Sequence, residues 1–403
     1  MAGPRFDVVV VGAGIIGLAV ARELQGRRPG LGLAVVDKEP ALGAHQTGHA
    51  SGVVHRGVYY APGSLKARLC VEGAARLLEY CDAQGIPVLR CGKVVVATDE
   101  DELPRLAELY RRSTANGVPR VELIGPERLR ELEPHVAGLQ AIHSPETAVV
   151  DFSLVAEAYG RDVTGAGGEL LLGREVRAFV RRGEATVVVE TSGGELEARR
   201  VVVCAGVYSD RLAASTGAEP EPRIVPFRGD YLVLRPESRH LVRGLVYPVP
   251  DPAFPFLGIH TTVRPDGAVW LGPNAVLALS REGYRRRDVR WRDLREIARS
   301  KGFRRLARRH WRMGAAETVR DLSTRRFVAA ARKLLPELDV ADVLPGPSGI
   351  RAQALAADGT LVDDFVFHES PGVVHVRNAP SPGATSSLAI ASVIADRVEA
   401  AGT

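Results

Sequence analysis

The feature that most constrains this chain is a glycine-rich turn near its start. The sequence GAGIIG at residues 12–17 completes the pattern GxGxxG. It lies between an apolar segment typical of a strand, 6–11, and one typical of a helix, 15–24. The three glycines allow a tight turn, close approach of the backbone to a pyrophosphate, and close packing of the helix on the strand. The pattern therefore predicts a βαβ unit that binds a dinucleotide.

An acidic residue supports this interpretation. Asp37 ends a second apolar segment, 33–36, and lies about 20 residues after Gly17. A carboxylate at this place accepts hydrogen bonds from the ribose of an adenosine, and it disfavours a 2′-phosphate. FAD and NAD both satisfy these features, so other segments must distinguish them.

Two later segments favour FAD. Residues 199–206 form an apolar strand that closes on Ala205-Gly206, and this resembles the second FAD contact of flavoproteins with two dinucleotide-binding domains. Residues 380–387, PSPGATSS, precede a final apolar helix. In those flavoproteins a late helix N-terminus lies near O2 and N1 of the flavin, where its partial positive charge stabilises the anionic reduced ring.

The rest of the chain predicts two interleaved domains. Segments 168–180, 185–191 and 195–205 alternate apolar strands with tight turns and predict a return to the first domain. Residues 224–272, rich in proline, aromatic and β-branched residues, predict a mainly antiparallel sheet. We expect an α/β protein, in which a Rossmann-like FAD-binding fold with two dinucleotide-binding domains carries an inserted, mainly antiparallel substrate domain. The expected FAD-binding domain comprises residues 1–90, 150–222 and 340–403, and the substrate-binding domain comprises 91–149 and 223–339.

Composition narrows the class of protein. The chain of 403 residues is 45% hydrophobic and 25% charged, which suffices for a large core. Its four cysteines form no CxxC pair and predict a reducing compartment. The longest apolar run, 8–21, is interrupted by glycines and is shorter than the roughly 20 residues of a membrane helix. Because residues 1–7 leave no room for an apolar leader, we expect a cytoplasmic protein.

Arginines are concentrated in residues 281–312. A solvated helical face is the interpretation that we favour. The alternative is peripheral contact with anionic lipid at the inner face of a membrane, which would suit an enzyme that passes electrons to a quinone. We expect no nucleic-acid partner, because no RNA-binding motif or DNA-reading fold accompanies the basic residues, and we expect no metal site.

Oxidation of a 2-hydroxy acid by a flavin sets two chemical requirements. The α-carbon loses a hydride to flavin N5 while the hydroxyl loses a proton, so a positioned histidine is required as a base. The carboxylate requires a fixed cation, best supplied by a planar guanidinium. Three glycine-containing segments offer such side chains: 47–60 with His49, His55 and Arg56, 256–262 with His260, and 346–353 with Arg351. The first segment also contains Tyr59 and Tyr60.

Several longer segments carry a family resemblance: 46–66, 226–231, 247–252, 254–260, 271–278, 281–284, 349–355 and 377–387. They are similar to the L-2-hydroxyglutarate dehydrogenase/oxidase family, within the D-amino-acid-oxidase-like flavoproteins, over essentially the whole chain. The resemblance implies non-covalent FAD, oxidation of L-2-hydroxyglutarate to 2-oxoglutarate, and an electron acceptor other than nicotinamide. We expect that acceptor to be either dioxygen or a quinone. Two residues depart from the family pattern. Ala50 replaces the Asn of TGHNSG, and Thr261 replaces an aromatic residue after His260, which leaves the exact substrate open.

The chemistry and the resemblance together give each candidate residue a role. We expect His55 to be the base, Arg351 to anchor the carboxylate, and His260 to be a second anchor or an alternative base. Substrate contacts are expected from Tyr59, Tyr60, Arg228 and Tyr247. FAD contacts are expected from Gly12, Gly14, Ile16, Gly17, Asp37, Lys38, Thr47, His49, Ser51, Gly52, Val176, Ala205, Gly206, Gly349, Pro382, Gly383 and Ala384.

Three alternatives stay open. An enzyme on the same fold could oxidise an amino acid or a biosynthetic intermediate. The chain could also bind a flavin without turning over a substrate. A nicotinamide-dependent dehydrogenase is the third alternative, and a purified protein without flavin absorbance would favour it.

Overall fold

The central strand of the largest sheet is β1 (Arg5–Val11). The computed structural model describes residues 3–251 and 258–400, so part of the expected segment 256–262 lies outside the described residues. β1 pairs in parallel with β2 (Leu33–Val36) and with β12 (Gly194–Val203). Its last four residues are all buried, which is typical of a strand covered on both faces.

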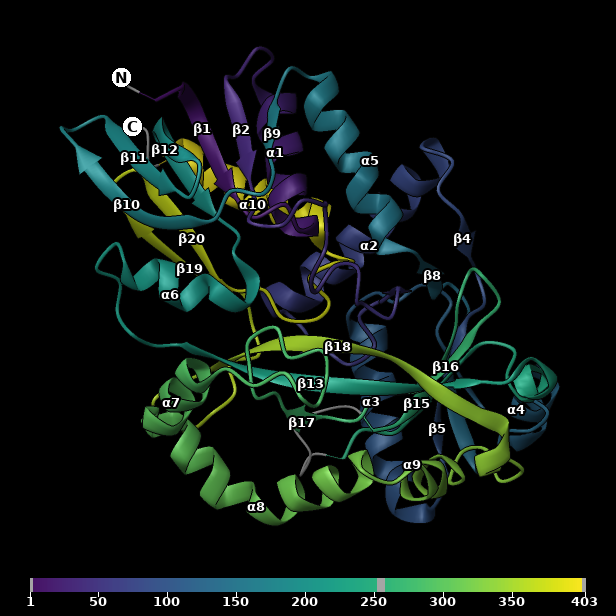
Figure 1. The fold of residues 1–403 in the computed structure, drawn as a ribbon. Helices are drawn as coiled ribbons and strands as arrows, with labels where there is room; N and C mark the ends of the chain where they lie inside the picture. Colours follow the sequence, from purple (N-terminus) through teal and green to yellow (C-terminus); the bar gives the residue numbers. More distant parts are fainter. Residues whose placement is uncertain (1–2, 252–257, 401–403) are drawn as a thin grey trace.

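Alternate residues of β1 face two different layers. Val8 and Val10 pack into a core shared with four helices, whereas Val9 and Val11 pack into a core shared with the antiparallel strands β10 and β11. Figure 1 shows this half of the molecule at the top, with α1 and α10 behind the sheet. The four helices are α1 (Ile15–Arg27), α2 (Leu65–Ala83), α5 (Phe152–Gly165) and α10 (Ser387–Ala400). The remaining strands of this sheet are β9 (Glu169–Leu171), β10 (Val176–Arg182), β11 (Thr186–Thr191), β19 (Val366–Ser370) and β20 (Val373–Asn378).

The other half is built around a long antiparallel pair, β13 (Arg223–Leu234) and β18 (Val343–Leu355). β13 also pairs with β16 (Val269–Gly272) and β17 (Val276–Leu277), and β16 pairs with β15 (His260–Val263). A second sheet consists of β14 (Leu245–Pro248), β5 (Lys93–Ala97), β7 (Gln140–Ser144) and β6 (Glu122–Ile124). A third, small sheet consists of β3 (Val53–Val54), β8 (Ala148–Val150) and β4 (Val88–Leu89).

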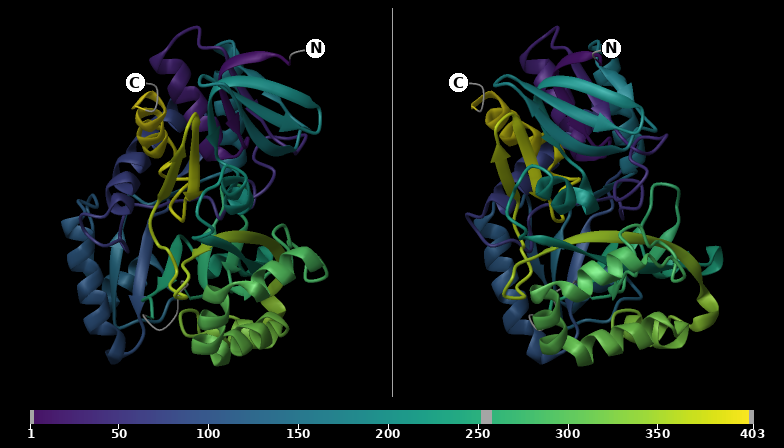
Figure 2. Two further views of the ribbon diagram at one scale, coloured as in Figure 1. Left: turned by 90° about the vertical axis from the view of Figure 1, so that its left-hand side faces the viewer. Right: turned by 60° about the vertical axis from the view of Figure 1, so that its left-hand side comes forward.

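Helices cover the outside of this second half. Figure 2 shows α7, α8 and α9 together at the end of the molecule away from the N-terminus. These three helices follow one another along the chain, and α6 connects the first sheet to β13. The remaining helices are α3 (Leu103–Ala115), α4 (Pro126–Leu132), α6 (Ser209–Ala214), α7 (Trp291–Arg299), α8 (Lys301–Asp321) and α9 (Thr324–Ala331).

The expected fold class is confirmed, since a mainly parallel sheet with helices is joined to mainly antiparallel sheets. β18 departs from the expected division of the chain. It lies within 340–403, which we expected in the FAD-binding domain, yet it pairs with β13 in the second half. An apolar strand does not reveal its partner in the sequence, because pairing is decided by contacts far along the chain. The other domain limits remain a prediction.

The four cysteines, Cys70, Cys81, Cys91 and Cys204, are all free. Within residues 3–251 and 258–400, no helix combines the length and the apolar character that crossing a membrane requires.

Helix α2 approaches the turn before α10 through Gly73. A Cβ at this position would lie 2.6 Å from Cα of Ser386 and 2.9 Å from the carbonyl oxygen of Thr385. We expect Gly73→Ala to lower the free energy of unfolding by about 1–3 kcal/mol, because backbone atoms cannot move aside as a flexible side chain can. Urea denaturation measures this change.

The matched control is Gly314→Ala in α8, where a Cβ would meet no atom within 4 Å. It should raise the free energy of unfolding by up to about 1 kcal/mol, because alanine favours a helix. Equal effects of the two substitutions would contradict the close contact at Gly73.

Candidate active site

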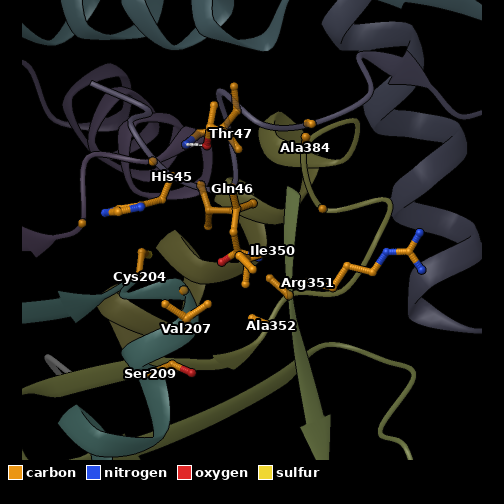
Figure 3. A pocket seen from close by; sticks show the side chains of 18 of the residues that line it. His45, Gln46, Thr47, Cys204, Val207, Ser209, Ile350, Arg351, Ala352 and Ala384 are labelled. Atoms are coloured by element: carbon orange, nitrogen blue, oxygen red, sulfur yellow. Dashed lines mark hydrogen bonds between the residues drawn. The ribbon is translucent and has the colours of Figure 1, made fainter. Parts of the chain in front are cut away.

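A cavity of about 980 Å³ extends from the glycine-rich turn to strands β15 and β18. Both halves of the molecule contribute to it. Figure 3 shows Thr47 and Cys204 from the first half and Arg351 from the second around this space. The volume lies at the upper end of the range for ligand pockets, which is large enough for a dinucleotide together with a small substrate.

The glycine-rich turn fits only glycine at two positions. Gly12 has a φ of 106°, and a Cβ there would lie 2.3 Å from the carbonyl oxygen of Cys204. A Cβ at Gly17 would lie 1.9 Å from the carbonyl oxygen of Gly12. These approaches hold β1, α1 and β12 together. The positive end of α1, which begins at Ile15 without a side-chain cap, borders the cavity and can receive a phosphate.

Asp37 fixes the turn from the end of β2. Its Oδ2 accepts a hydrogen bond from the N–H of Ala13 at 2.7 Å, and its Oδ1 accepts one from the N–H of Glu39 at 2.8 Å. Thr47 supports the same turn, since its Oγ1 accepts from the N–H of Ile15 at 3.0 Å. A carboxylate oxygen has two lone pairs, so Asp37 can hold the turn and also bind a ribose hydroxyl.

The turn before α10 also borders the cavity and holds the loop of His55. Pro382, Gly383 and Ala384 line the cavity. Oγ1 of Thr385 accepts a hydrogen bond from the N–H of His55 at 3.1 Å and donates one to the carbonyl oxygen of Val53 at 3.3 Å. The loop that carries the candidate base is therefore fastened to the start of the last helix.

The three candidate catalytic residues, His55, His260 and Arg351, line the same cavity. Burial lowers the pKa of His260 to about 3. Burial, followed by the charges of Lys93 and His260, holds the pKa of His55 well below its usual value. Both imidazoles are therefore neutral near pH 7 and can accept a proton.

His260 is held in one orientation. Its Nδ1 donates to the carbonyl oxygen of Gly258 at 2.8 Å, and its ring stacks on Tyr247 with centroids 3.8 Å apart. The neutral ring then offers Nε2 as an acceptor. Because an acceptor cannot bind a carboxylate, this tautomer favours contact with a hydroxyl group over the expected role as a second carboxylate anchor.

Arg351 enters the cavity from β18, where it lies opposite Phe227 of β13. Burial lowers its pKa, whereas the neighbouring rings of Tyr231 and Tyr247 act in the opposite direction. A guanidinium stays charged in proteins, so Arg351 supplies a permanent cation.

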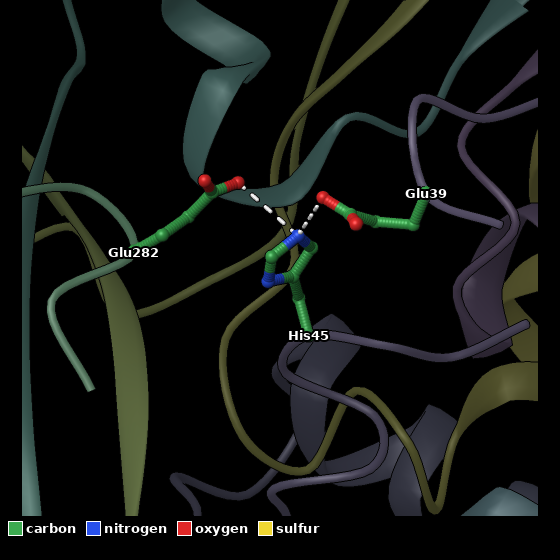
Figure 4. Close-up of side chains that lie close together, drawn as sticks. All are labelled: Glu39, His45 and Glu282. Atoms are coloured by element: carbon green, nitrogen blue, oxygen red, sulfur yellow. Dashed lines mark hydrogen bonds and ion pairs between the residues drawn. The ribbon is translucent and has the colours of Figure 1, made fainter. Parts of the chain in front are cut away.

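A cluster of Glu39, His45 and Glu282 has the ligand types of a metal site (Figure 4). Lys38 reaches the same carboxylates. Its Nζ lies 2.7 Å from Oε1 of Glu282 and also pairs with Glu39. Although burial lowers the pKa of Lys38, these two carboxylates raise it above its usual value. The ammonium group offsets part of the negative charge of the cluster, and the resulting network of ion pairs links the two halves.

The cavity collects most of the residues expected from the sequence. Three of the expected substrate contacts, Tyr59, Tyr60 and Tyr247, lie in its wall. The expected FAD contacts that line it are Gly12, Gly14, Ile16, Gly17, Asp37, Lys38, Thr47, His49, Ser51, Val176, Ala205, Gly206, Gly349, Pro382, Gly383 and Ala384.

Arg228 and Gly52 do not line the cavity, so the contacts expected of them stay predictions. Arg228 is 4% exposed and binds Asp230 at 2.9 Å and Asp321 at 3.1 Å. Its neighbour Gly229 faces the cavity, so the alternation of β13 turns Arg228 to the other side. Gly52, with a φ of 86°, packs against β8 instead.

Some cavity residues were missed in the sequence. Lys66 and Asp363 both line the cavity, and their charged groups lie 2.6 Å apart. Lys66 is a lysine on the buried face of an amphipathic helix, which is the signal that could have identified it. Tyr231 also lines the cavity, and its position in the PFRGDY segment was not singled out as a contact.

The two departures from the family pattern have different surroundings. Ala50 lines the cavity, so the side-chain amide of the family's Asn is missing at a place where a ligand would bind. Thr261 is 1% exposed, and its Oγ1 accepts from the N–H of Val246 at 3.1 Å. It joins β15 to β14 and does not line the cavity within the described residues.

The family model that matches this chain and its similar sequences agree with each other. Residues 7–397 match the family model described as "FAD dependent oxidoreductase". The chain is 49% identical to the mitochondrial L-2-hydroxyglutarate dehydrogenase of Nematostella vectensis, covering 98% of this chain and 90% of that protein. It is 48% identical to the mitochondrial enzyme of the same name from Homo sapiens, covering 98% and 89%. It is 43% identical to L-2-hydroxyglutarate dehydrogenase of Escherichia coli, covering 98% and 93%.

Solved structures share the fold. L-α-glycerophosphate oxidase from Mycoplasma pneumoniae, reduced by dithionite and with FAD bound, has a TM-score of 0.80 at 21% identity, covering 98% of this chain and 95% of that one. Glycine oxidase from Geobacillus kaustophilus has a TM-score of 0.72 at 22% identity, with the same coverage. At these identities the likeness concerns the fold alone.

The expectation of a cytoplasmic protein is contradicted. The similar proteins from N. vectensis, H. sapiens and Bos taurus are named mitochondrial, and the E. coli relative is bacterial. The short segment before β1 was therefore no guide to location.

The residues around the cavity fit FAD. Gly12 and Gly17 form a turn that side chains would obstruct, Asp37 borders the cavity at the end of β2, and Pro382, Gly383 and Ala384 before α10 also line it. Together with the family match over residues 7–397, this shows that the chain belongs to the L-2-hydroxyglutarate dehydrogenase family of FAD-dependent oxidoreductases.

Proposed function

We propose that this enzyme oxidises L-2-hydroxyglutarate to 2-oxoglutarate. The observation that carries the proposal is the convergence of His55, His260 and Arg351 on the cavity that begins at the glycine-rich turn. The names of the relatives from N. vectensis, H. sapiens and E. coli support the same substrate.

Each of the three residues receives a role from its state in the cavity. Arg351 binds the carboxylate next to the hydroxyl group, because its guanidinium stays charged when buried. His55, neutral through burial, accepts the hydroxyl proton. His260 accepts a hydrogen bond from the same hydroxyl at Nε2 or acts as the alternative base, since its Nδ1–H already donates to the carbonyl oxygen of Gly258. FAD, when bound, accepts the hydride from the α-carbon.

We infer that the cofactor contacts divide along the cavity. Gly12, Gly14 and Gly17 receive the pyrophosphate at the start of α1, and Asp37 binds the ribose. Pro382, Gly383 and Ala384 line the part of the cavity close to His55, to which the Thr385 hydrogen bonds connect them, and we assign them to the flavin ring. The remaining contacts from the sequence prediction that line the cavity belong to the same proposal.

The proposal is tested by anaerobic reduction of the flavin in the purified holoenzyme. We expect L-2-hydroxyglutarate to bleach the flavin at least about tenfold faster than D-2-hydroxyglutarate, L-lactate or L-glutamate, because discrimination depends on how each substrate fits the fixed groups. Faster bleaching by L-glutamate would contradict the proposal and favour oxidation of an amino acid. Bleaching by none of these compounds would indicate a protein that binds a flavin without oxidising a substrate of this kind.

Replacing the base should slow the chemistry while leaving the cofactor bound. We expect His55→Ala to slow anaerobic flavin reduction by about 10²-fold or more, because the first-choice proton acceptor is then lost. The flavin content should match that of the wild type. His240→Ala, which alters an exposed ring bonded to the backbone of Glu237, serves as the control and should retain the wild-type rate. An unchanged rate in His55→Ala would remove His55 from the mechanism.

We propose that the electron acceptor is dioxygen or a quinone, and that α8 contacts an anionic lipid surface. Trp311 is 63% exposed and stands among exposed arginines of α8, and Trp291 of α7 is 77% exposed. Tryptophan beside arginine suits the interface of a membrane, where the ring enters the headgroup layer and the guanidinium meets phosphate. Reoxidation of the reduced enzyme by dioxygen or by a soluble quinone distinguishes the acceptors.

Sedimentation with vesicles tests the lipid contact. We expect binding to phosphatidylcholine vesicles that contain about 30% phosphatidylglycerol, and little binding to phosphatidylcholine alone, because the attraction is electrostatic. The triple variant Arg308→Glu, Arg309→Glu, Trp311→Ala should lose it. The control Arg111→Glu, Arg128→Glu removes two exposed arginines elsewhere and should keep it. Equal binding of both variants would contradict the role of α8.

A further inference from the structure

Lys93 is a buried lysine to which neither the proton transfer nor the cofactor contacts give a role. It begins β5, a strand whose residues are all buried, and it is 3% exposed. Its Nζ lies 3.7 Å from the ring centroid of Tyr247 and 4.7 Å from that of Tyr59. Removing an ammonium group from water is costly, so its position calls for a function.

Other lysines near the cavity are neutralised. Lys66 pairs with Asp363 at 2.6 Å. Lys38 pairs with Glu282 at 2.7 Å. Lys93 has no carboxylate within ion-pair distance in the part of the chain that the structure describes. The aromatic rings stabilise its charge only in part, so it retains positive charge that an anion in the cavity can use.

Lys93 lies one aromatic layer behind the cavity wall. The ring of His260 stacks on one face of Tyr247 at 3.8 Å, so the ammonium group of Lys93, at 3.7 Å from the same centroid, must lie over the other face. A small space bordered by Lys93 is also bordered by His55 and Tyr59, both of which line the main cavity. The charge is therefore separated from a bound ligand by side chains and not by bulk water.

We propose that Lys93 is a specificity-determining residue, whose ammonium group favours substrates with a second carboxylate over substrates with one. This inference rests on the proposed function, because it assumes that a 2-hydroxy acid is oxidised in the cavity. Arg351 accounts for the carboxylate beside the hydroxyl group. Lys93 adds a second positive charge, and with little water between the charges its attraction for a dianion is weakly screened.

The protonation of Lys93 makes the preference dependent on pH. Burial lowers its pKa to about 7, so the ammonium form is lost as the pH rises through this value. Binding of a diacid should weaken over the same range. The nearby groups with a shifted pKa keep one charge state between about pH 6.5 and 8.5. Burial raises the pKa of four of them, which therefore stay neutral: Tyr59, Tyr247, Cys70 (about 12) and Cys91 (about 11). Burial lowers the pKa of His55 and His260 (about 3), which also stay neutral. It lowers the pKa of Arg56 and Arg351 as well, but their guanidinium groups stay charged.

Steady-state kinetics of the holoenzyme test the proposal with two substrates of equal length. L-2-hydroxypentanoate has the five-carbon chain of L-2-hydroxyglutarate but lacks its second carboxylate. We expect Lys93→Met to raise KM for the diacid by about tenfold or more, and to change KM for the monoacid by no more than about twofold. Lys93→Arg, which keeps the charge, should retain most of the preference. An equal change for both substrates, or none for either, would overturn the proposal.

A second measurement uses the wild-type holoenzyme and so does not depend on the folding of a variant. Glutarate and pentanoate, which lack the reactive hydroxyl, are titrated while the flavin absorbance is followed. We expect the Kd of glutarate to rise about tenfold from pH 6.5 to 8.5, as one proton is lost, and that of pentanoate to stay nearly constant. A Kd for glutarate that is independent of pH, or parallel changes for both ligands, would contradict the role of Lys93.

The failure of this inference can be told apart from failure of the proposed function. If L-2-hydroxyglutarate reduces the wild-type flavin and Lys93→Met keeps the preference for the diacid, the role of Lys93 is wrong and the proposed function stands. If no 2-hydroxy acid reduces the wild-type flavin, the proposed function is wrong and the inference falls with it.

Discussion

The close approach of three backbone segments at the glycine-rich turn determines the rest of the structure. A Cβ at Gly17 would lie 1.9 Å from the carbonyl oxygen of Gly12, and a Cβ at Gly12 would lie 2.3 Å from that of Cys204. Only glycine permits these contacts, which bring β1, α1 and β12 to one point. The positive end of α1 then borders the cavity, and Asp37 at the end of the adjacent strand fastens the turn from its other side. The same cavity continues to the candidate catalytic residues.

The parts of the site that could be predicted from the sequence are those set by local geometry. A strand, a glycine turn, a helix and a second strand ending in Asp37 lie within the first 37 residues, so spacing alone orders them. The loop that carries His55 comes soon after this unit in the sequence. Arg228 shows where this reasoning ends. Whether its side chain faces the cavity depends on the pairing of β13 with β18, and on the acidic side chains of Asp230 and Asp321, which spacing cannot show.

Local sequence reveals neither the side of a strand that faces the cavity nor which charged side chains are neutralised by a partner. Lys38 follows Asp37 and lines the cavity, but Glu282, from a distant segment, neutralises it together with Glu39. Lys93 lies in a run of buried valines that indicates nothing beyond a strand. Only the folded structure distinguishes a lysine with a carboxylate partner from one that faces two tyrosine rings. The resemblance to a family predicted an FAD site and the candidate histidines, whereas the balance of charge around the cavity required the three-dimensional arrangement.

Burial keeps the histidines of this cavity neutral and strengthens the interactions of its cations, and the two effects are compatible. Removal from water keeps His55 and His260 neutral, which a base requires, and it also strengthens every charge that remains. After burial, the charge of Lys93 already contributes to the lowered pKa of His55, and a cation placed directly against the ring would lower its basicity further and oppose the proton transfer. In the proposed function, the aromatic layer of Tyr59 and Tyr247 lets the charge of Lys93 act on a bound anion from behind the wall of the cavity that the imidazoles line. Proton acceptance and recognition of negative charge can therefore occupy one small, water-poor cavity because they act from different layers of it.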